Sequence, residues 1–371
     1  MTTITKKRSL AGLALAGAAA MLLAGCASAD NGGTPTTTTP PEGVDYKACM
    51  VSDAGGFQDN SFNQSAHEGL LAAEKNLGIK MADAESRDEG DFVTNINSLI
   101  GEGCNLIVTV GFLLEQATED AAKANPEVDF VLIDATLSDE NFAPVILPNV
   151  KSIVYDTAQA AYLAGYLAAG QSKTGTVATY AGMLIPSVTI FMDGFADGVA
   201  AYNKAKGTSV KVLGWDKASQ NGSAVGNFDD QLAGQTLTEG FLAQGADIIF
   251  PVAGPVGHGT IAAVENAGSK ASIIWVDADG FLTVPAAKGL FLSSVLKQMT
   301  QAIEDVIGEA VKGKFSNEAY VGTLSNGGVD LAPFHDHDAD VSADMKKELD
   351  ALKADIISGK LKVESPAQAA L

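Results

Sequence analysis

Residues 46–77 read YKACMVSDAGGFQDNSFNQSAHEGLLAAEKNL. The first six are mostly apolar, a Gly–Gly loop follows, and from Ser61 to Leu77 apolar residues recur at helical spacing. The stretch therefore predicts a short buried strand, a polar loop and a helix.

This strand-then-helix unit recurs along the chain. Further strands are expected at 105–110, 130–134, 176–180, 210–215, 247–252 and 272–277, and helices at 92–102, 114–124, 157–171, 188–204, 231–244 and 258–267. Apolar strands that do not alternate with polar residues, and that are joined by helices, predict a parallel sheet covered on both faces.

Two internal echoes divide the chain into halves. Gly55–Gly78 is echoed by Gly182–Gly207, and LIVTVGF from Leu106 by IIFPVAG from Ile248. We therefore predict an α/β fold of two doubly wound parallel-sheet lobes, formed by residues 45–155 with about 281–320, and by 156–280 with about 321–371. Ligands bind beyond the carboxyl ends of such strands, so two facing lobes would border one cleft.

The first 44 residues stand apart from this pattern. Lys6, Lys7 and Arg8 precede an uncharged apolar stretch, and the sequence from Leu23 to Cys26 resembles a bacterial lipobox. We expect residues 1–25 to be a cleaved signal peptide, Cys26 to carry lipid, and 26–44 to be a flexible linker rich in Thr, Pro and Gly. The alternative is an uncleaved membrane anchor, because a bilayer-spanning helix needs only ~20 apolar residues.

The composition limits the class of protein. With 46% hydrophobic and 19% charged residues in a chain of 371, it is globular and long enough for roughly two domains. The net charge is −21, and cleavage before Cys26 would remove three basic residues. Nucleic acid is therefore not an expected partner.

Two cysteines remain in the expected folded body, Cys49 and Cys104. Export would permit their oxidation. If their strands run parallel with aligned carboxyl ends, however, the sulfurs would be staggered by ~13 Å. Because that exceeds the reach of a disulfide, we predict two buried free thiols.

Acidic side chains gather at the expected strand ends. Asp53 follows the first strand, and Asp134 and Asp277 end two others. Carboxylates accept hydrogen bonds from vicinal hydroxyls and ring N–H groups, so this rim suits a sugar or nucleoside better than an anion. Any one aspartate alone could simply cap a helix or tighten a turn.

Phenylalanines stand in two of the polar loops. Phe57 and Phe62 lie in the first loop, and Phe228 lies in the sequence GNFDD. One ring from each lobe could stack on the two faces of a planar ligand. The alternative is that these rings are buried under their loops as part of the core.

Catalytic and cofactor motifs are absent from the sequence. It contains no P-loop, no Gly-x-Ser-x-Gly and no Gly-x-Gly-x-x-Gly after a strand. His335 and His337 could ligate a metal, but they lie in an expected loop near the C-terminus. We predict a binding protein without catalytic residues, metal or cofactor.

Several motifs together resemble one family. They are CMVSDAGG at 49–56, DNSFNQ at 59–64, GF at 111–112, NFDD at 227–230, VDAD at 276–279 and SSVLK at 293–297. This set is similar to that of the basic membrane protein family, the nucleoside-binding lipoproteins of bacterial ABC importers. The resemblance covers about residues 46–334 and implies a ribose-binding-type fold with two lobes and a three-stranded hinge.

The same resemblance implies eight ligand-binding residues. They are Phe62 and Phe228 at the base faces, Asp53 and Asn63 at the base edge, Asp277 and Lys297 at the ribose hydroxyls, and Asp134 and Gly254 in the remaining wall. Phe191 holds the place of Phe62 in the internal repeat, so either Phe191 or Phe228 could be the second clamp. Lys297 could instead form only a salt bridge.

The function expected from the resemblance is capture of a nucleoside of the purine class by closure of the two lobes. The expected partners are an ABC permease and ATPase and, through the lipid on Cys26, the outer face of the cell membrane, with the protein itself a monomer. Three other functions stay open: a receptor for sugars or other small molecules, a nucleoside hydrolase, and a surface antigen or adhesin.

Overall fold

The computed structural model describes residues 44–141, 143–268 and 271–369. The expected signal peptide, Cys26 and the expected linker up to residue 43 lie outside them. Within the described residues, no helix has both the length and the hydrophobicity that a membrane span requires.

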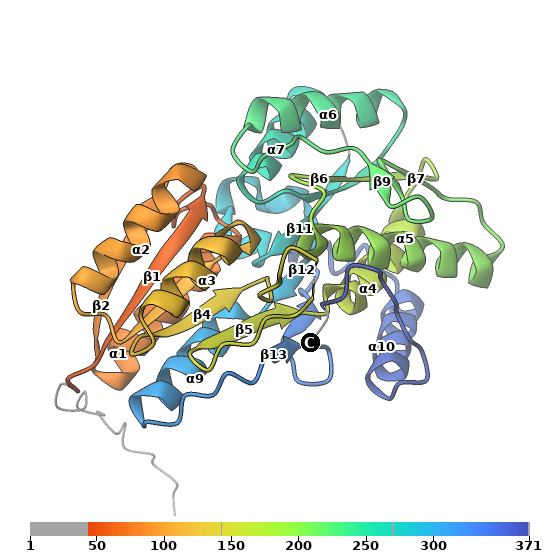
Figure 1. The fold of residues 1–371 in the computed structure, drawn as a ribbon. Coiled ribbons are helices and arrows are strands. Elements are labelled where there is room, and N and C mark those ends of the chain that lie inside the picture. Colours follow the sequence, from red (N-terminus) through yellow and green to blue (C-terminus); the bar gives the residue numbers. More distant parts are fainter. Residues whose placement is uncertain (1–43, 142, 269–270, 370–371) are drawn as a thin grey trace, which may run out of the picture. The chain divides into compact units, whose positions relative to one another are not determined.

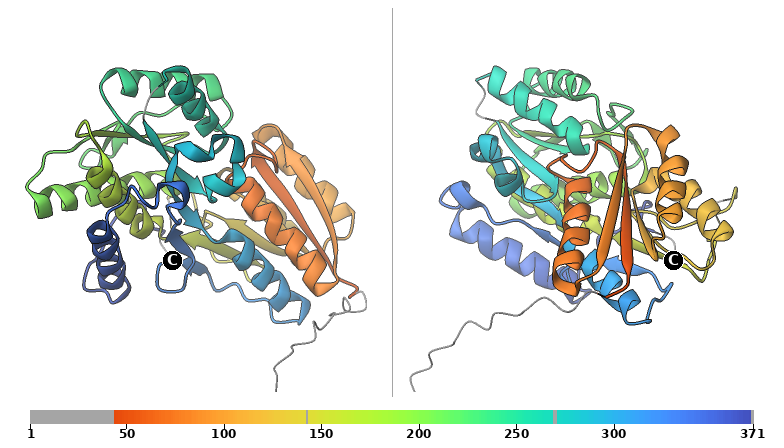
Figure 2. Two further views of the ribbon diagram at one scale, coloured as in Figure 1. Left: turned by 180° about the vertical axis from the view of Figure 1, so that it is seen from behind. Right: turned by 90° about the vertical axis from the view of Figure 1, so that its left-hand side faces the viewer.

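The first sheet has six parallel strands in the order β13-β5-β4-β3-β1-β2 (Figure 1). They are β1 (Lys47–Ala54), β2 (Lys80–Ser86), β3 (Leu106–Val110), β4 (Asp129–Ile133), β5 (Val150–Tyr155) and β13 (Tyr320–Gly322). Helices α1 (Phe62–Leu77) and α9 (Met299–Val311) pack together on one face, and α2 (Phe92–Gly101) and α3 (Glu115–Ala124) cover the other (Figure 2).

Strand β1 shows why both faces are covered. Ala48 and Met50 belong to the hydrophobic cluster under α1, whereas Cys49 and Val51 belong to the cluster under α2. Successive side chains of a strand point to opposite faces, so an unbroken apolar run needs a helix layer on each side.

The second sheet has six strands in the order β14-β12-β11-β10-β6-β7. They are β6 (Thr176–Ala181), β7 (Lys211–Leu213), β10 (Ile248–Val252), β11 (Ser272–Asp277), β12 (Phe291–Lys297) and β14 (Val329–Leu331), of which only β14 pairs antiparallel with its neighbour. Its helices are α4 (Thr157–Gln171), α5 (Pro186–Lys206), α6 (Gln231–Ala243), α7 (Gly257–Asn266), the short α8 (Gly280–Thr283) and α10 (Ala343–Ile357). A two-stranded ribbon, β8 (Trp215–Asp216) with β9 (Asn221–Gly222), lies beside it.

The two sheets repeat one topology. Strands β1, β2, β3 and β4 hold the same places in the first sheet as β6, β7, β10 and β11 hold in the second. The predicted doubly wound α/β fold of two lobes is therefore confirmed, and the internal echoes correspond to equivalent strand-and-helix units.

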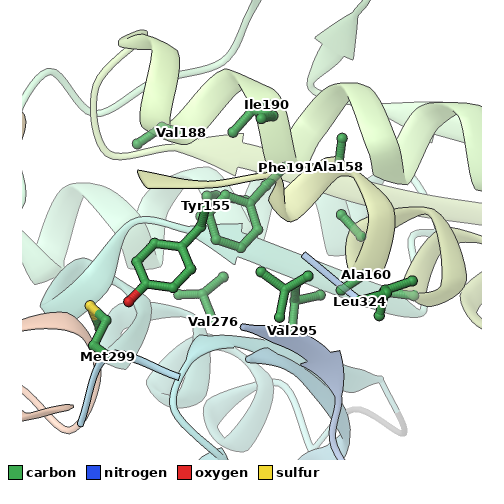
Figure 3. Close-up of a cluster of buried hydrophobic side chains, with 14 of the residues drawn as sticks. Tyr155, Ala158, Ala160, Val188, Ile190, Phe191, Val276, Val295, Met299 and Leu324 are labelled. Carbon is green, nitrogen blue, oxygen red and sulfur yellow. The ribbon is translucent and has the colours of Figure 1, made fainter. Parts of the chain in front are cut away.

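The chain passes between the sheets three times: after β5, between β12 and α9, and between β13 and β14. Tyr155, Val276, Val295 and Met299 pack in one hydrophobic cluster around these crossings (Figure 3). The strand memberships differ from the segment boundaries that we expected. β12 lies in the second sheet, so of residues 281–320 only those from α9 onward lie with the first.

The prediction of free thiols is wrong. Cys49 and Cys104 form a disulfide, with their Cα atoms 6.0 Å apart. The prediction assumed that Cys104 continues the line of β3, but this strand begins only at Leu106. The chain turns at Gly103, whose φ is 79°, and brings Cys104 into the hydrophobic cluster that also contains Cys49.

Replacing both cysteines by alanine is expected to lower the free energy of unfolding by about 4 kcal/mol, because the bond closes a loop of 55 residues in the unfolded chain. Urea denaturation followed by circular dichroism measures this, with reduced wild-type protein as a second comparison. Equal midpoints for the oxidised wild type and the double variant would contradict the expectation.

Candidate functional site

A cavity lies among the loops that follow the central strands of both sheets. It holds about 550 Å³ of space free of protein atoms, a volume that includes the solvent at its open mouth. The cavity brings together every residue that the sequence predicted for the site: Asp53, Phe62, Asn63, Asp134, Phe228, Gly254, Asp277 and Lys297.

A buried lysine joins the two lobes at this cavity. Lys297, the last residue of β12, forms an ion pair with Asp134 of the first lobe, and its Nζ lies 3.4 Å from Oδ1 of Asp277 in the second. All three side chains are less than 10% exposed. Lys297 thus makes the salt bridge that the sequence left open as its alternative role, and it also faces the cavity.

Asp134 and Asp277 occupy equivalent places in the repeat. Each stands at the carboxyl end of its strand, β4 or β11, and each has left-handed backbone geometry, with φ of 64° and 65°. Non-glycine residues rarely adopt this conformation, and it concentrates at functional sites. The backbone therefore aims both carboxylates at the same lysine.

In this cluster, burial and the neighbouring charges shift the pKa values of Asp134 and Lys297 in opposite directions. Burial raises the pKa of Asp134, and the ammonium of Lys297 opposes that rise. Burial by itself would lower the pKa of Lys297, but the charges of Asp134 and Asp277 outweigh it and the pKa is raised. Lys297 therefore stays protonated at neutral pH.

Asp59 fixes the loop that leads into α1. Its carboxylate accepts hydrogen bonds from the backbone N–H groups of Ser61 (2.9 Å), Asn63 (2.8 Å) and Gln64 (3.0 Å). The sequence contained a signal for this role, because aspartates in turns and at helix starts commonly accept hydrogen bonds from backbone N–H groups. We assigned no role to Asp59 from the sequence.

Asn63 holds Asp53 in place. Its Nδ2 donates to Asp53 Oδ1 at 2.8 Å and to Asp59 Oδ2 at 3.2 Å, and its Oδ1 accepts from the backbone N–H of Asp53 at 3.3 Å. Both N–H donors of this amide are therefore used inside the protein. Asn63 lines the cavity, and these contacts make it a positioning residue for Asp53.

Asp53 is buried, and its carboxyl group lies against Gly111. Burial raises its pKa to about 8, with Asn63 opposing the rise and the charges of Asp59, Asp134 and Asp277 adding to it. A Cβ atom at residue 111 would lie 2.6 Å from Asp53 Oδ2, so only glycine fits there.

The phenylalanines divide into cavity walls and core. Phe62 begins α1 and Phe228 lies in the loop before α6, and both are partly exposed and line the cavity. Phe191 also touches the cavity, but it is only 1% exposed and packs edge-on against Phe250. Phe57 belongs to the hydrophobic core, because it is buried and stacks on His67. For this ring the alternative given by the sequence, burial under its loop, is correct.

Glycine also shapes the wall on the side of the second lobe. A Cβ atom at Gly182 would lie 2.4 Å from the ring of Phe228, so that ring rests directly on the backbone after β6. Nζ of Lys297 lies 5.0 Å from the ring centroids of both Phe62 and Phe191. With the ring of Tyr155, whose centroid lies 5.9 Å from Nζ, the ammonium faces three aromatic rings as well as two carboxylates.

The first loop also contacts the second lobe directly. The carbonyl oxygen of Asn60 accepts from Trp275 Nε1 at 3.2 Å and from Thr283 Oγ1 at 2.9 Å. Ser61 Oγ donates to Asp277 Oδ2 at 3.0 Å. Sequence reasoning missed these contacts, because they join residues more than 200 positions apart that no pattern relates.

The two C-terminal histidines have separate partners. His335 Nε2 lies 2.7 Å from Asp279 Oδ2, and its ring stacks on Phe281. His337 contacts Asp340 and the carbonyl of Gly289. Among the described residues, no group of three or more His, Cys, Asp or Glu side chains is placed to hold a metal ion.

Comparison with known proteins gives consistent matches. Residues 46–366 match the model of the Bmp family, described as PnrA-like ABC transporter substrate-binding proteins. The ABC transporter nucleoside-binding protein BmpA of Lactococcus lactis subsp. cremoris is 32% identical, with 97% of this chain and 99% of that protein covered. Basic membrane protein B of Borreliella burgdorferi is 29% identical, with 72% and 74% covered.

Solved structures support the same fold. An ABC transporter solute-binding protein from Aeropyrum pernix K1 is 27% identical, with a TM-score of 0.77 and with 87% of this chain and 94% of that chain covered. A solute-binding protein from Bacillus halodurans with bound myo-inositol has a TM-score of 0.54 at 14% identity, with 81% and 99% covered. The second likeness concerns the fold alone.

The substitution Lys297→Met is expected to lower the free energy of unfolding by about 3–5 kcal/mol, because it leaves Asp134 and Asp277 buried together without a cation. Urea denaturation at neutral pH measures the loss. The matched control is Lys80→Met, which removes an exposed pair with Asp45 and should cost less than about 1 kcal/mol. Equal losses for the two variants would argue against the buried pair.

Proposed function

The chain belongs to the Bmp family of PnrA-like ABC transporter substrate-binding proteins, and from the geometry of the cavity we propose that it captures a nucleoside, of the purine class, between its two lobes. The observation that carries the proposal is one cavity with partly exposed aromatic rings from both lobes and a buried Lys–Asp cluster. A base has two flat faces and a ribose has vicinal hydroxyls, so this combination suits a nucleoside.

Phe62 and Phe228 are proposed to hold the base. Stacking on an aromatic side chain contributes roughly 1–3 kcal/mol per base. Phe228 is preferred to Phe191 as the second ring, because Phe191 is almost fully buried and packs on Phe250. The purine class is proposed because the two fused rings of a purine offer a larger stacking area than a pyrimidine.

The ribose is proposed to bind at Asp277 and Lys297. Oδ1 of Asp277 has no hydrogen-bond partner among the described residues, although Lys297 lies within ion-pair distance. A buried acceptor without a donor costs free energy, and a ribose hydroxyl would supply that donor. The name of the Lactococcus lactis relative, a nucleoside-binding protein, agrees with this assignment.

The charge of the cavity argues against phosphorylated ligands. Four carboxyl groups line it, those of Asp53, Asp59, Asp134 and Asp277, against the one ammonium of Lys297 among the described lining residues. A 5′-phosphate would bring further negative charge into this buried cluster. We therefore propose nucleosides and not nucleotides as substrates.

Closure of the lobes is proposed as the means of capture. The contacts of Asn60 and Ser61 with Trp275 and Asp277 bridge the two lobes, and a ligand that touches both lobes favours the arrangement in which these contacts form. The closed protein would deliver its substrate to an ABC permease and ATPase. Lipid on Cys26 would tether it at the outer face of the cell membrane.

Isothermal titration calorimetry tests the substrate class. Adenosine, guanosine or inosine is expected to bind, and ribose, free bases and AMP much more weakly. Phe62→Ala should weaken nucleoside binding by roughly 5- to 150-fold, the equivalent of one stacked ring. The matched control is Phe315→Ala, because Phe315 is partly buried and does not line the cavity.

A clear isotherm for ribose with no heat from any nucleoside would overturn the assignment in favour of a sugar receptor. Unchanged affinity in Phe62→Ala would remove the stacking role. Release of hypoxanthine from inosine would show the hydrolase activity that the sequence left open as an alternative.

Tryptophan fluorescence tests closure. Trp275 donates to the carbonyl of Asn60 in the opposite lobe, so its emission is expected to change when a nucleoside saturates the site. Trp215 supplies a constant background, because its partner Asp193 lies in the same lobe. The change should vanish in Trp275→Phe, and an unchanged wild-type spectrum at saturation would count against closure.

A further inference from the structure

The carboxyl groups of the cavity differ in how their charge is compensated. Asp59 accepts three backbone N–H groups at the start of α1. Asp134 and Asp277 share the ammonium of Lys297. Asp53 is 8% exposed and, within the described part of the chain, it forms no ion pair and its carboxyl accepts one hydrogen bond, from the amide of Asn63.

The amide of Asn63 also distinguishes the two oxygens of Asp53. Because its Oδ1 accepts from the backbone N–H of Asp53, its Nδ2 must be the group that faces Asp53 Oδ1. Oδ1 is thus an acceptor inside the protein. Oδ2 forms no hydrogen bond with any described residue and lies beside Gly111, in the wall of the cavity.

We infer that Asp53 carries a proton on Oδ2 and donates it in a hydrogen bond to an acceptor atom on the edge of the base. This inference rests on the proposed function and deepens it. The ligand must present an unprotonated ring nitrogen or a carbonyl oxygen towards Asp53. The neutral carboxyl also reduces the repulsion among the four acidic groups of the cavity.

The groups around Asp53 support this protonation state. Asp59 before α1, Asp134 at the end of β4 and Asp277 at the end of β11 all add negative charge near it, and they raise its pKa in the same direction as burial does. Lys297 at the end of β12 is engaged by two of them. Glu85 of the neighbouring strand β2 accepts from the backbone N–H of Phe57 and does not line the cavity.

Two histidines lie close to the first loop: His67, whose ring stacks on Phe57 outside the cavity lining, and His258. Nε2 of His258 lies 3.4 Å from Nδ2 of Asn60, and it does not line the cavity. A pH experiment on Asp53 therefore needs a variant that lacks the His258 side chain. The variant His258→Gln provides that control.

The first experiment needs no ligand. Asp53 keeps its proton in the folded protein up to about pH 8, whereas an aspartate in the unfolded chain loses it above about pH 4. Its contribution to stability is therefore complete below about pH 4 and is lost as the pH rises to about 8. Asp53→Asn stays neutral at every pH. Between about pH 4 and pH 8, the ratio of its folding equilibrium constant to that of the wild type should therefore rise by up to about tenfold per pH unit.

Urea denaturation of the two full chains, refolded from denaturant to remove retained ligand, measures this difference at several pH values. An infrared difference spectrum should also show the C=O band of a protonated carboxyl in the wild type at pH 7 and lose it in Asp53→Asn. A difference between wild type and Asp53→Asn that does not vary with pH overturns the inference and leaves nucleoside binding untouched.

The second experiment uses adenosine, which does not itself titrate near neutral pH. Calorimetry in buffers of different ionisation enthalpy should show a constant Kd up to about pH 7, then a loss of affinity that approaches tenfold per pH unit above about pH 8, with uptake of up to one proton. The affinity of Asp53→Asn should not vary with pH in this range, because its amide donates from the place of Oδ2 and does not titrate. His258→Gln should keep the wild-type profile.

Proton release on binding, or affinity that rises with pH, would show that Asp53 acts as an ionised acceptor and would overturn the inference. Loss of the pH dependence in His258→Gln would do the same. If the ligand-free stability shows the proton but no nucleoside gives heat at any pH, the proposed function fails, and the donor role of Asp53 towards a base fails with it.

Discussion

One buried ammonium sets the arrangement of this protein. Lys297 needs counter-charges, because a charge that is buried without a partner costs several kcal/mol. Its two partners come from different sheets, Asp134 from the end of β4 and Asp277 from the end of β11. The pairing can form only when the carboxyl edges of the two sheets face each other. The same condition creates the cavity, so a stabilising contact and the proposed binding site have one physical origin.

The strand ends and the glycines next to them carry this geometry. The left-handed backbone at Asp134 and Asp277 turns both side chains towards Lys297, and it is maintained because the surrounding sheet fixes the chain on either side. Gly111 and Gly182 then allow Asp53 and Phe228 to approach the backbone more closely than any other residue would permit. The cavity is thus shaped by backbone conformation as much as by side-chain choice.

The apolar runs and the internal echoes were sufficient to predict the fold and the edge of the sheet on which the site lies. Parallel strands align their carboxyl ends, so side chains that follow different strands meet even when they are far apart in sequence. The peripheral elements gave weaker signals. β2 reads KMADAES and has only one fully buried residue, and β13 and β14 are three residues each, so no apolar run marks them. The disulfide was missed because residue 104 follows directly on the turn at 102–103, outside β3, where strand geometry does not apply.

The phenylalanines of the cavity show that an internal repeat predicts where a residue lies in the fold better than it predicts what that residue does. Seven residues separate β1 from α1, and Phe62 stands at the first position of its helix, at the cavity wall. Only four residues separate β6 from α5, so the corresponding Phe191 falls one and a half turns inside its helix and is buried beside Lys297. The wall on that side is then completed by Phe228 from another loop, which rests on Gly182. The two lobes share one topology, but the length of a single connection decides which ring faces the cavity and which becomes core.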